Sequence, residues 1–526
     1  MRRRPDNAFE GVNTGFGGSA DTRTRMIKEL QATLIRELNS GILTNPSKVE
    51  FHAHSKGSHT AANAYLANAN AYNDTCMPED WVRASILIRI NSLVTGHSGV
   101  RPVLIERLAE LLRHNIVPRI PLRGSISASG DLMPLSYLGA TLEGKHSTMV
   151  WAGKKPNRRL VSAAEALLEV NMSPIQFGPK EGLAIINGTA VSTGVGLLAV
   201  HDASSLALLS QMLTAMSVEA LRGTTESFDL FFDGVRPHAG QKNAATKIRR
   251  LLAGSHLTFN NDGSEEASLR QNRYAIRTAA QWIGPILEDL ELASRQVTIE
   301  CNSVTDNPLV DFGPGDTMAN PRVLHGGNFQ AKAVTSAVEK TRLGLQSIGQ
   351  MLFAQCTEII DPRMNNGLPP NLTADEPSQS FLCKPVDIMI AALQSELGFL
   401  ANPAGTAVQS AEMGNQSLNS LALVSARYTH VALEVLSQMA ACHLFVVCQA
   451  LDLRAMHLRF LNIFRPKFAD IISDTLGSAL SKGSAMHTEC SHSQSSSRPL
   501  KRPSEAIERE SHLVRETDTS ANGEAP

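Results

Sequence analysis

Three consecutive small residues, Ala128, Ser129 and Gly130, carry the most distinctive chemistry in the sequence. If a tight bend brings the Gly130 nitrogen to the Ala128 carbonyl, the nitrogen can attack it, because glycine has no Cβ in the way. Loss of water from the closed ring and from the Ser129 side chain leaves a 4-methylidene-imidazol-5-one (MIO) ring with an exocyclic methylene. No standard side chain is such an electrophile, so the backbone would supply a built-in cofactor. An ordinary turn is the alternative, since Gly and Ser are common turn formers.

The surrounding segment, residues 121–137, reads Pro-Leu-Arg-Gly-Ser-Ile-Ser-Ala-Ser-Gly-Asp-Leu-Met-Pro-Leu-Ser-Tyr. This frame resembles the corresponding segment of the aromatic amino acid ammonia-lyases, and the resemblance extends over about residues 10–455. It implies a carbon–nitrogen lyase of the fungal phenylalanine ammonia-lyase type, which eliminates ammonia from L-phenylalanine to give trans-cinnamate. The expected setting is L-phenylalanine catabolism and the phenylpropanoid branch of secondary metabolism that uses cinnamate.

The Gly-rich stretch 11–24 resembles the family's mobile loop over the active site, and glycines suit a lid that must bend. Directly before it, Glu10 occupies the position of the tyrosine that serves the family as base. A carboxylate can act as a base if burial raises its pKa. The lead before this loop, Met1–Phe9, is shorter than in the family, so a Glu base and an incomplete N-terminus both stay open, as does an inactive truncated paralogue.

Other segments match family positions that contact the substrate or surround the ring. Asn187 is expected to help polarise the ring, and the forked guanidinium of Arg277 is suited to the substrate carboxylate. The resemblance implies these substrate-binding residues: Asn187, Gln271, Tyr274, Arg277, Asn307, Phe329, Lys384, Glu412, Asn415 and Gln416. The spacing predicts one helical face for Gln271, Tyr274 and Arg277, and another for Glu412 and Gln416. A solvated polar stripe is the alternative for such a face.

Substrate preference depends on two positions that resemble the family's specificity pair, Glu37 and Leu38. Leu38 favours phenylalanine over tyrosine, whereas Glu37 matches neither pattern. Tyr137 stands where the histidine branch usually has His, which argues against histidine as substrate. A tyrosine ammonia-lyase remains open, as does an MIO-dependent aminomutase, which would return ammonia to the neighbouring carbon.

Composition favours a small-molecule partner. The 526 residues include 49 Lys and Arg against 50 Asp and Glu, a net charge of -1, so no global field attracts nucleic acid or a membrane surface. Seven cysteines without paired spacing and an N-terminus without an apolar signal indicate reduced thiols and a cytoplasmic protein. No apolar run reaches the ~20 residues of a membrane span. His52, His54 and His59 lack neighbouring Cys or carboxylate ligands, so no metal site is expected.

The elements that must position these residues are predicted to be mainly α-helical. Long Ala- and Leu-rich stretches at 194–221, 329–355, 386–400 and 417–453 predict a bundle of long helices. We expect a helical, loop-rich MIO domain (1–193), a long-helix core domain (194–483) and a disordered tail (484–526), in the ammonia-lyase/fumarase-like class. The resemblance implies a homotetramer whose active sites combine residues from several subunits.

Overall fold

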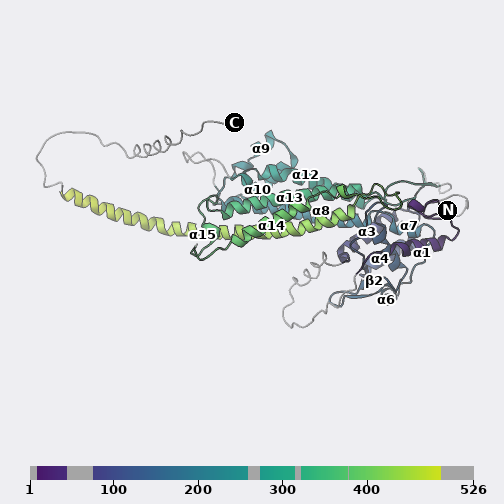
Figure 1. Ribbon diagram of the computed structural model, residues 1–526. Helices are drawn as coiled ribbons and strands as arrows, with labels where there is room; N and C mark the ends of the chain where they lie inside the picture. The colour runs from purple at the N-terminus through teal and green to yellow at the C-terminus, as the bar shows by residue number, and fades with distance from the viewer. Residues whose placement is uncertain (1–8, 44–74, 259–272, 314–320, 377, 487–526) are drawn as a thin grey trace, which may run out of the picture. The chain divides into compact units, whose positions relative to one another are not determined.

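The structure is a computed structural model that describes residues 9–43, 75–258, 273–313, 321–376 and 378–486. The described chain is mainly helical, which confirms the predicted fold class (Figure 1). It divides into two compact units, Met1–Ala455 and Met456–Pro526. The domain boundaries expected at residues 193 and 483 stay a prediction, and the predicted disordered tail lies almost wholly outside the described residues.

The N-terminal part of the first unit consists of short elements. They are η1 (Gly17–Ser19), α1 (Ile27–Leu38), α3 (Glu79–Val94), α4 (Pro102–Arg113), β1 (Val117–Pro118), α5 (Leu132–Leu142), β2 (Met149–Ala152), β3 (Arg159–Ser162), α6 (Ala163–Glu169) and α7 (Glu181–Ile186). The strands form one antiparallel sheet in the order β1-β2-β3. α1 buries Leu34 and Ile35, four and five residues after the half-buried Leu30, against α5 and α7. This apolar stripe holds α1 against α5 and α7.

Long helices joined by shorter elements dominate the rest of the first unit, and the last helix continues past Ala455 into the second unit. The elements are α8 (Ala190–Ala220), η3 (Thr225–Phe228), α9 (Leu230–Val235), α10 (Ala239–Leu251), α11 (Tyr274–Arg277), α12 (Ala279–Cys301), β4 (Leu309–Asp311), β5 (Arg322–Leu324), α13 (Lys332–Ile360), η4 (Pro370–Leu372), α14 (Lys384–Leu400), η5 (Ala404–Ala407) and α15 (Ala422–Met486). α8, α12 and α13 pack against one another around an aliphatic core that includes Leu213, Leu345 and Leu436 (Figure 1). The predicted long helices are therefore present, with ends shifted by a few residues in α8, α13 and α14, whereas α15 continues well beyond the predicted end at 453.

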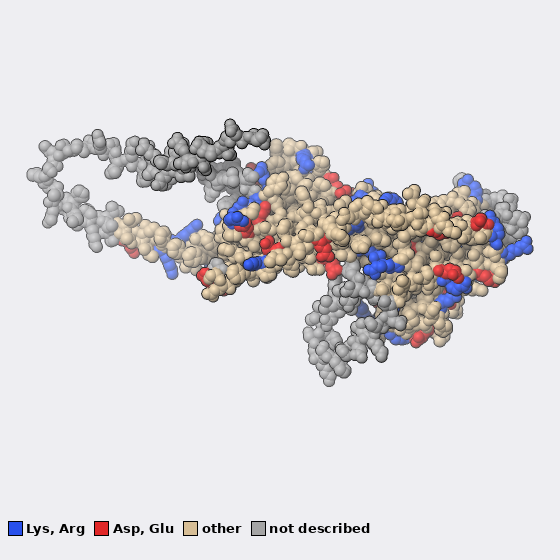
Figure 2. Space-filling model, viewed as in Figure 1, with Lys and Arg blue, Asp and Glu red and all other residues tan. Residues whose placement is uncertain are grey.

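Two described helices, α8 and the 422–476 part of α15, are long and apolar enough to cross a membrane by length and composition. In each, 56% of the apolar window is buried inside the protein, a pattern that core helices of soluble proteins also show. Lys, Arg, Asp and Glu are interspersed over the face seen in Figure 2, without a large area of one sign.

Candidate active site

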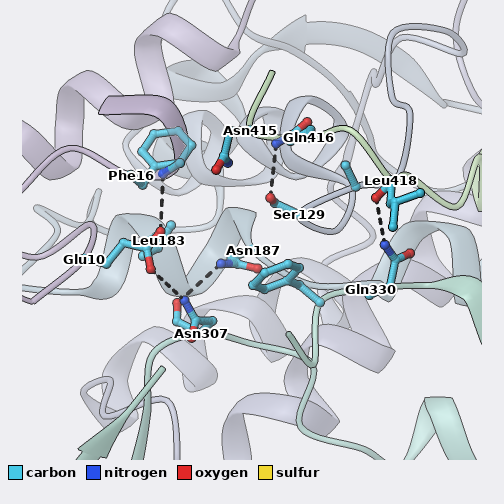
Figure 3. Close-up of a pocket in the computed structure, with 13 residues that line it drawn as sticks. Glu10, Phe16, Ser129, Leu183, Asn187, Asn307, Gln330, Asn415, Gln416 and Leu418 are labelled. Atoms are coloured by element: carbon cyan, nitrogen blue, oxygen red, sulfur yellow. Dashed lines mark hydrogen bonds between the residues drawn. The ribbon is translucent and has the colours of Figure 1, made fainter. Parts of the chain in front are cut away.

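A pocket of about 250 Å³ opens beside the Ala128–Ser129–Gly130 bend (Figure 3). It brings together segments that are far apart in the sequence. The lining residues are Glu10, Phe16, Gly17, Ala128, Ser129, Leu183, Asn187, Asn307, Phe329, Gln330, Asn415, Gln416 and Leu418. Eight of the residues predicted for the site thus face one cavity: Glu10, Ala128, Ser129, Asn187, Asn307, Phe329, Asn415 and Gln416.

The bend itself has a backbone that only glycine fits at its third position. Gly130 has a φ of 71° and forms an isolated parallel bridge with Gly188. A Cβ at Gly130 would lie 2.2 Å from the Gly188 carbonyl oxygen, and the Asp131 N–H donates to the same oxygen at 2.8 Å. The absence of a Cβ is what ring closure also requires of this residue, so the segment fits the MIO group.

Buried polar groups hold the residues on either side of the triplet. Ser127 has a φ of 48°, which is unfavourable for a residue with a Cβ. Its hydroxyl donates to Asp131 Oδ1 at 2.7 Å, and its carbonyl accepts from the Ser420 hydroxyl at 2.6 Å. Asp131 Oδ2 accepts from the Ser192 N–H at 2.7 Å. Burial raises the pKa of Asp131, and these hydrogen bonds oppose the shift.

Three helices begin beside the bend. α5 starts directly after Asp131, α8 starts two residues after Gly188, and the first turn of α15 donates from the Leu423 N–H to the Ser127 hydroxyl at 3.1 Å. The N-terminal end of a helix carries a partial positive charge. The ends of α5, α8 and α15 therefore favour negative charge where the electrophile is predicted.

Polar side chains face the cavity from several sides (Figure 3). Gln416 Nε2 donates to the Ser129 hydroxyl at 3.1 Å, and Asn187 Nδ2 donates to the Asn307 carbonyl at 3.3 Å. Glu10 Oε2 accepts from Asn307 Nδ2 at 3.1 Å and lies 3.6 Å from His325 Nδ1. The Glu10 carboxylate is thus part of the pocket wall.

The loop predicted to be a lid contacts the segment around residue 412. The Gly18 N–H donates to Glu412 Oε1 at 2.9 Å, and Asn415 Nδ2 donates to Glu412 Oε2 at 2.9 Å. The prediction that Glu412 and Gln416 share a helix is wrong. Glu412 and Met413 have φ values of 55° and 53°, and Ala411 pairs with Gln416 across a tight turn. Spacing alone could not distinguish this turn, closed by backbone pairing, from a helix.

Other predicted residues lie away from this cavity. Tyr274 and Arg277 are exposed on α11, which has only four residues, and Lys384 is exposed at the start of α14 with its Nζ 5.5 Å from the Phe381 ring. Glu37 is exposed and Leu38 packs on the N-terminal core, so neither lines the pocket. Gln271 and the histidines at 52, 54 and 59 lie outside the described residues.

Sequence analysis missed five residues that line the cavity: Phe16, Gly17, Leu183, Gln330 and Leu418. Four of them adjoin or lie within segments that had been singled out, so their position in the sequence was the available signal. Leu418 lies at the start of the stretch 417–453, whose composition predicted a helix and gave no sign of a pocket residue. Within the described parts of the chain, no group of three or more His, Cys, Asp or Glu side chains could hold a metal ion.

A family model described as "Aromatic amino acid lyase" matches residues 6–467. A phenylalanine ammonia-lyase of Aspergillus hancockii is 49% identical over 456 residues, which are 87% of this chain and 62% of that protein. A phenylalanine aminomutase (L-beta-phenylalanine forming) of Talaromyces islandicus is 48% identical over 455 residues, 86% of this chain and 60% of that protein. The crystal structure of a yeast phenylalanine ammonia-lyase from Rhodosporidium toruloides superimposes with a TM-score of 0.78 at 45% identity, covering 86% of this chain and 65% of that one.

The long-helix fold and the bend with its pocket define a protein of the ammonia-lyase class. With the match over residues 6–467, this chain belongs to the aromatic amino acid lyase family, and the resemblance in its sequence is confirmed. It spans about 60% of the length of these curated relatives.

Proposed function

We propose that this protein eliminates ammonia from L-phenylalanine and releases trans-cinnamate. The observation that carries the proposal is the Ala128–Ser129–Gly130 bend, which lies at a pocket of about 250 Å³ and at three helix N-termini. The ring, once formed from these residues, supplies an electrophilic methylene for the substrate amine. The positive ends of α5, α8 and α15 favour the charge that develops there.

The pocket residues take the following parts in the proposal. Asn187 and Gln416 orient the ring, and Phe329 contacts the aromatic side chain of the substrate. Asn307 binds the substrate carboxylate. Glu10 removes the β-proton, because it is the carboxylate that lines the pocket at the position of the family base.

The role of Glu10 can be tested with two substitutions. Glu10→Gln keeps the shape and removes the base, so kcat should fall by about 10²-fold or more with a smaller change in KM. Glu10→Tyr restores the family residue and should raise activity on phenylalanine above that of the parent. Equal activity of the parent and Glu10→Gln would show that another group accepts the proton.

Three more assigned residues, Tyr274, Arg277 and Lys384, lie on the surface of the described single chain. We therefore propose a cytoplasmic homotetramer in which neighbouring subunits bring these residues, with Gln271 and Glu412, to the site. Native mass spectrometry gives the subunit number. Arg277→Met should raise KM for phenylalanine without changing the fold, since it removes the proposed carboxylate partner.

The test of the whole proposal is product analysis by chromatography after incubation with L-phenylalanine, together with intact mass. Cinnamate and free ammonia, with a mass about 36 Da below the sequence mass for two lost waters, are expected. An aminomutase is the second candidate, favoured by the relative from Talaromyces islandicus, and it would yield β-phenylalanine instead. If the protein turns over L-tyrosine faster than L-phenylalanine, it is a tyrosine ammonia-lyase. Full mass and no turnover would leave an inactive paralogue.

A further inference from the structure

Three buried charged residues lie behind the pocket wall. Arg89 on α3, Lys180 before α7 and Asp306 before β4 are each no more than 1% exposed. Lys180 Nζ lies 2.6 Å from Asp306 Oδ2, and the Asp306 charge also acts on Arg89. Two cations thus share one carboxylate, an arrangement that costs free energy of desolvation. Burial lowers the pKa of both Arg89 and Lys180, and Asp306 opposes the shift.

This cluster contacts the two segments that carry the pocket amides. Arg89 Nη1 donates to the Asn187 carbonyl at 2.6 Å, and the Asp306 carboxylate accepts from the Asn307 N–H at 2.7 Å. Arg89 Nε and Nη2 are buried without a hydrogen-bond partner among the described residues. Because unpaired buried donors are costly, stability alone gives no reason for a guanidinium here.

A single residue, Gly188, links Arg89 to the Ala128–Ser129–Gly130 bend. A Cβ at Gly188 would be only 2.2 Å from Arg89 Nη1, so the guanidinium packs directly against that glycine. Gly188 also pairs with Gly130. Gly188 therefore contacts both Arg89 and Gly130, the residue whose nitrogen must close the ring.

We propose that Arg89 is a positioning residue for ring formation: it holds the Asn187–Gly188 backbone against Gly130 so that the bend is kept closed while the ring forms. The inference rests on the proposed function, because it concerns the same ring. The free energy of desolvation that the buried Arg89 costs is then explained by its function, because a rigid residue supports the bend. Lys180 and Asp306 hold the adjacent Asn307 segment in place.

The test follows the intact mass of newly made protein during cell-free synthesis. Arg89→Met removes the donor at similar length, and this variant should lack the mass decrease of about 36 Da. Arg89→Lys keeps the charge with a single amine, and it should show the decrease more slowly than the parent. Turnover is not needed for either result.

A matched control is Arg454→Met. Arg454 is also buried and donates to two backbone carbonyls, those of Ala220 at 2.8 Å and Asn365 at 2.6 Å, but unlike Asn187 neither of these residues lines the pocket. This variant should lose thermal stability and still show the mass decrease at the parent's rate. Maturation of both Arg89 variants at the parent's rate would overturn the proposal.

Two further outcomes separate this inference from the proposed function. If Arg89→Met is insoluble, the time course of Arg89→Lys decides alone, and a parental rate counts against positioning. A parent that never loses the two waters removes the ring and this inference together. A parent that loses them without forming cinnamate leaves the Arg89 test intact while the proposed activity fails.

Discussion

Buried hydroxyl groups behave differently in the bend region (residues 125–131, 187–192 and 420–423) and in the long-helix core of α8 and α13. In the core, Thr214, Ser217 and Thr341 each donate to the carbonyl four residues earlier in their own helix at 2.8 Å. In the bend region, Ser420 donates to the carbonyl of Ser127, 293 residues away. Each of these core hydroxyls makes a local bond within its helix, although Thr214 and Ser217 also reach Gln355 and His443, whereas the bend joins segments 293 residues apart. The geometry of the bend therefore depends on the folded chain.

The largest expected effect concerns the bend region alone. Ser129→Ala leaves no hydroxyl to depart as water, so the ring should not form and cinnamate production should fall by at least about 10³-fold. Ser136→Ala on α5 is the control, because its buried hydroxyl donates only to the Met133 carbonyl of its own helix. Cinnamate absorbance and intact mass measure both variants. Normal turnover by Ser129→Ala would remove the distinction in function between the two regions.

The second effect concerns stability. Lys180→Met removes the nearer of the two cations from the buried Asp306 carboxylate, leaves only the charge of Arg89, and should cost about 3–5 kcal/mol. Lys340→Met on α13 is the matched change in the helix core, where Lys340 is half-buried and donates to Gln296 at 2.8 Å. It should cost about 1 kcal/mol or less. Urea denaturation gives the unfolding free energy of both variants. Equal losses would show that the buried ion pair contributes no more than the half-buried lysine of the helix core.

The sequence predicted the long-helix core better than it predicted the bend region and the turns around it. α8 and α13 were predicted because their Ala- and Leu-rich composition is visible in a single stretch of chain. The turn at 411–416 was predicted as a helix, since its closure depends on Ala411 pairing with Gln416 and on left-handed residues. The pocket residues came from resemblance to a family. Neither spacing nor composition indicated that Arg89 packs behind Gly188, because that contact joins residues 99 apart.

The third effect tests the helix core through pH. His443 on α15 is fully buried beside the Ser217 hydroxyl at 2.9 Å, and burial lowers its pKa to about 3. Since the unfolded pKa is about 6.5, the neutral form is favoured in the fold, and stability is lost as the pH falls below 6.5. From about pH 7.5 to about pH 5 the loss should be about 2 kcal/mol. His443→Gln should remove this part of the pH dependence of the unfolding free energy, measured by urea denaturation at several pH values. An unchanged pH dependence would mean that another group causes it.

The smallest effect probes a local hydroxyl in the core. Thr341→Val keeps the shape of the side chain and removes only the bond to the Ala337 carbonyl, which still has its helical donor. The expected cost is about 0.5 kcal/mol, measured as a shift in melting temperature. Ser127→Ala should cost about 1–3 kcal/mol, because it removes a donor from buried Asp131. A larger cost for Thr341→Val than for Ser127→Ala would reverse the comparison.

The contact between Gly130 and Gly188 has a consequence at the level of the gene. A Cβ at either position would meet an atom at 2.2 Å, the Gly188 carbonyl oxygen in one case and the Arg89 guanidinium in the other. Every glycine codon begins with the same two bases, so at these two codons only changes in the third base are silent. Every other single-base change either stops translation or adds a side chain that would clash with these atoms. A saturation mutagenesis library should therefore lose such changes at both positions.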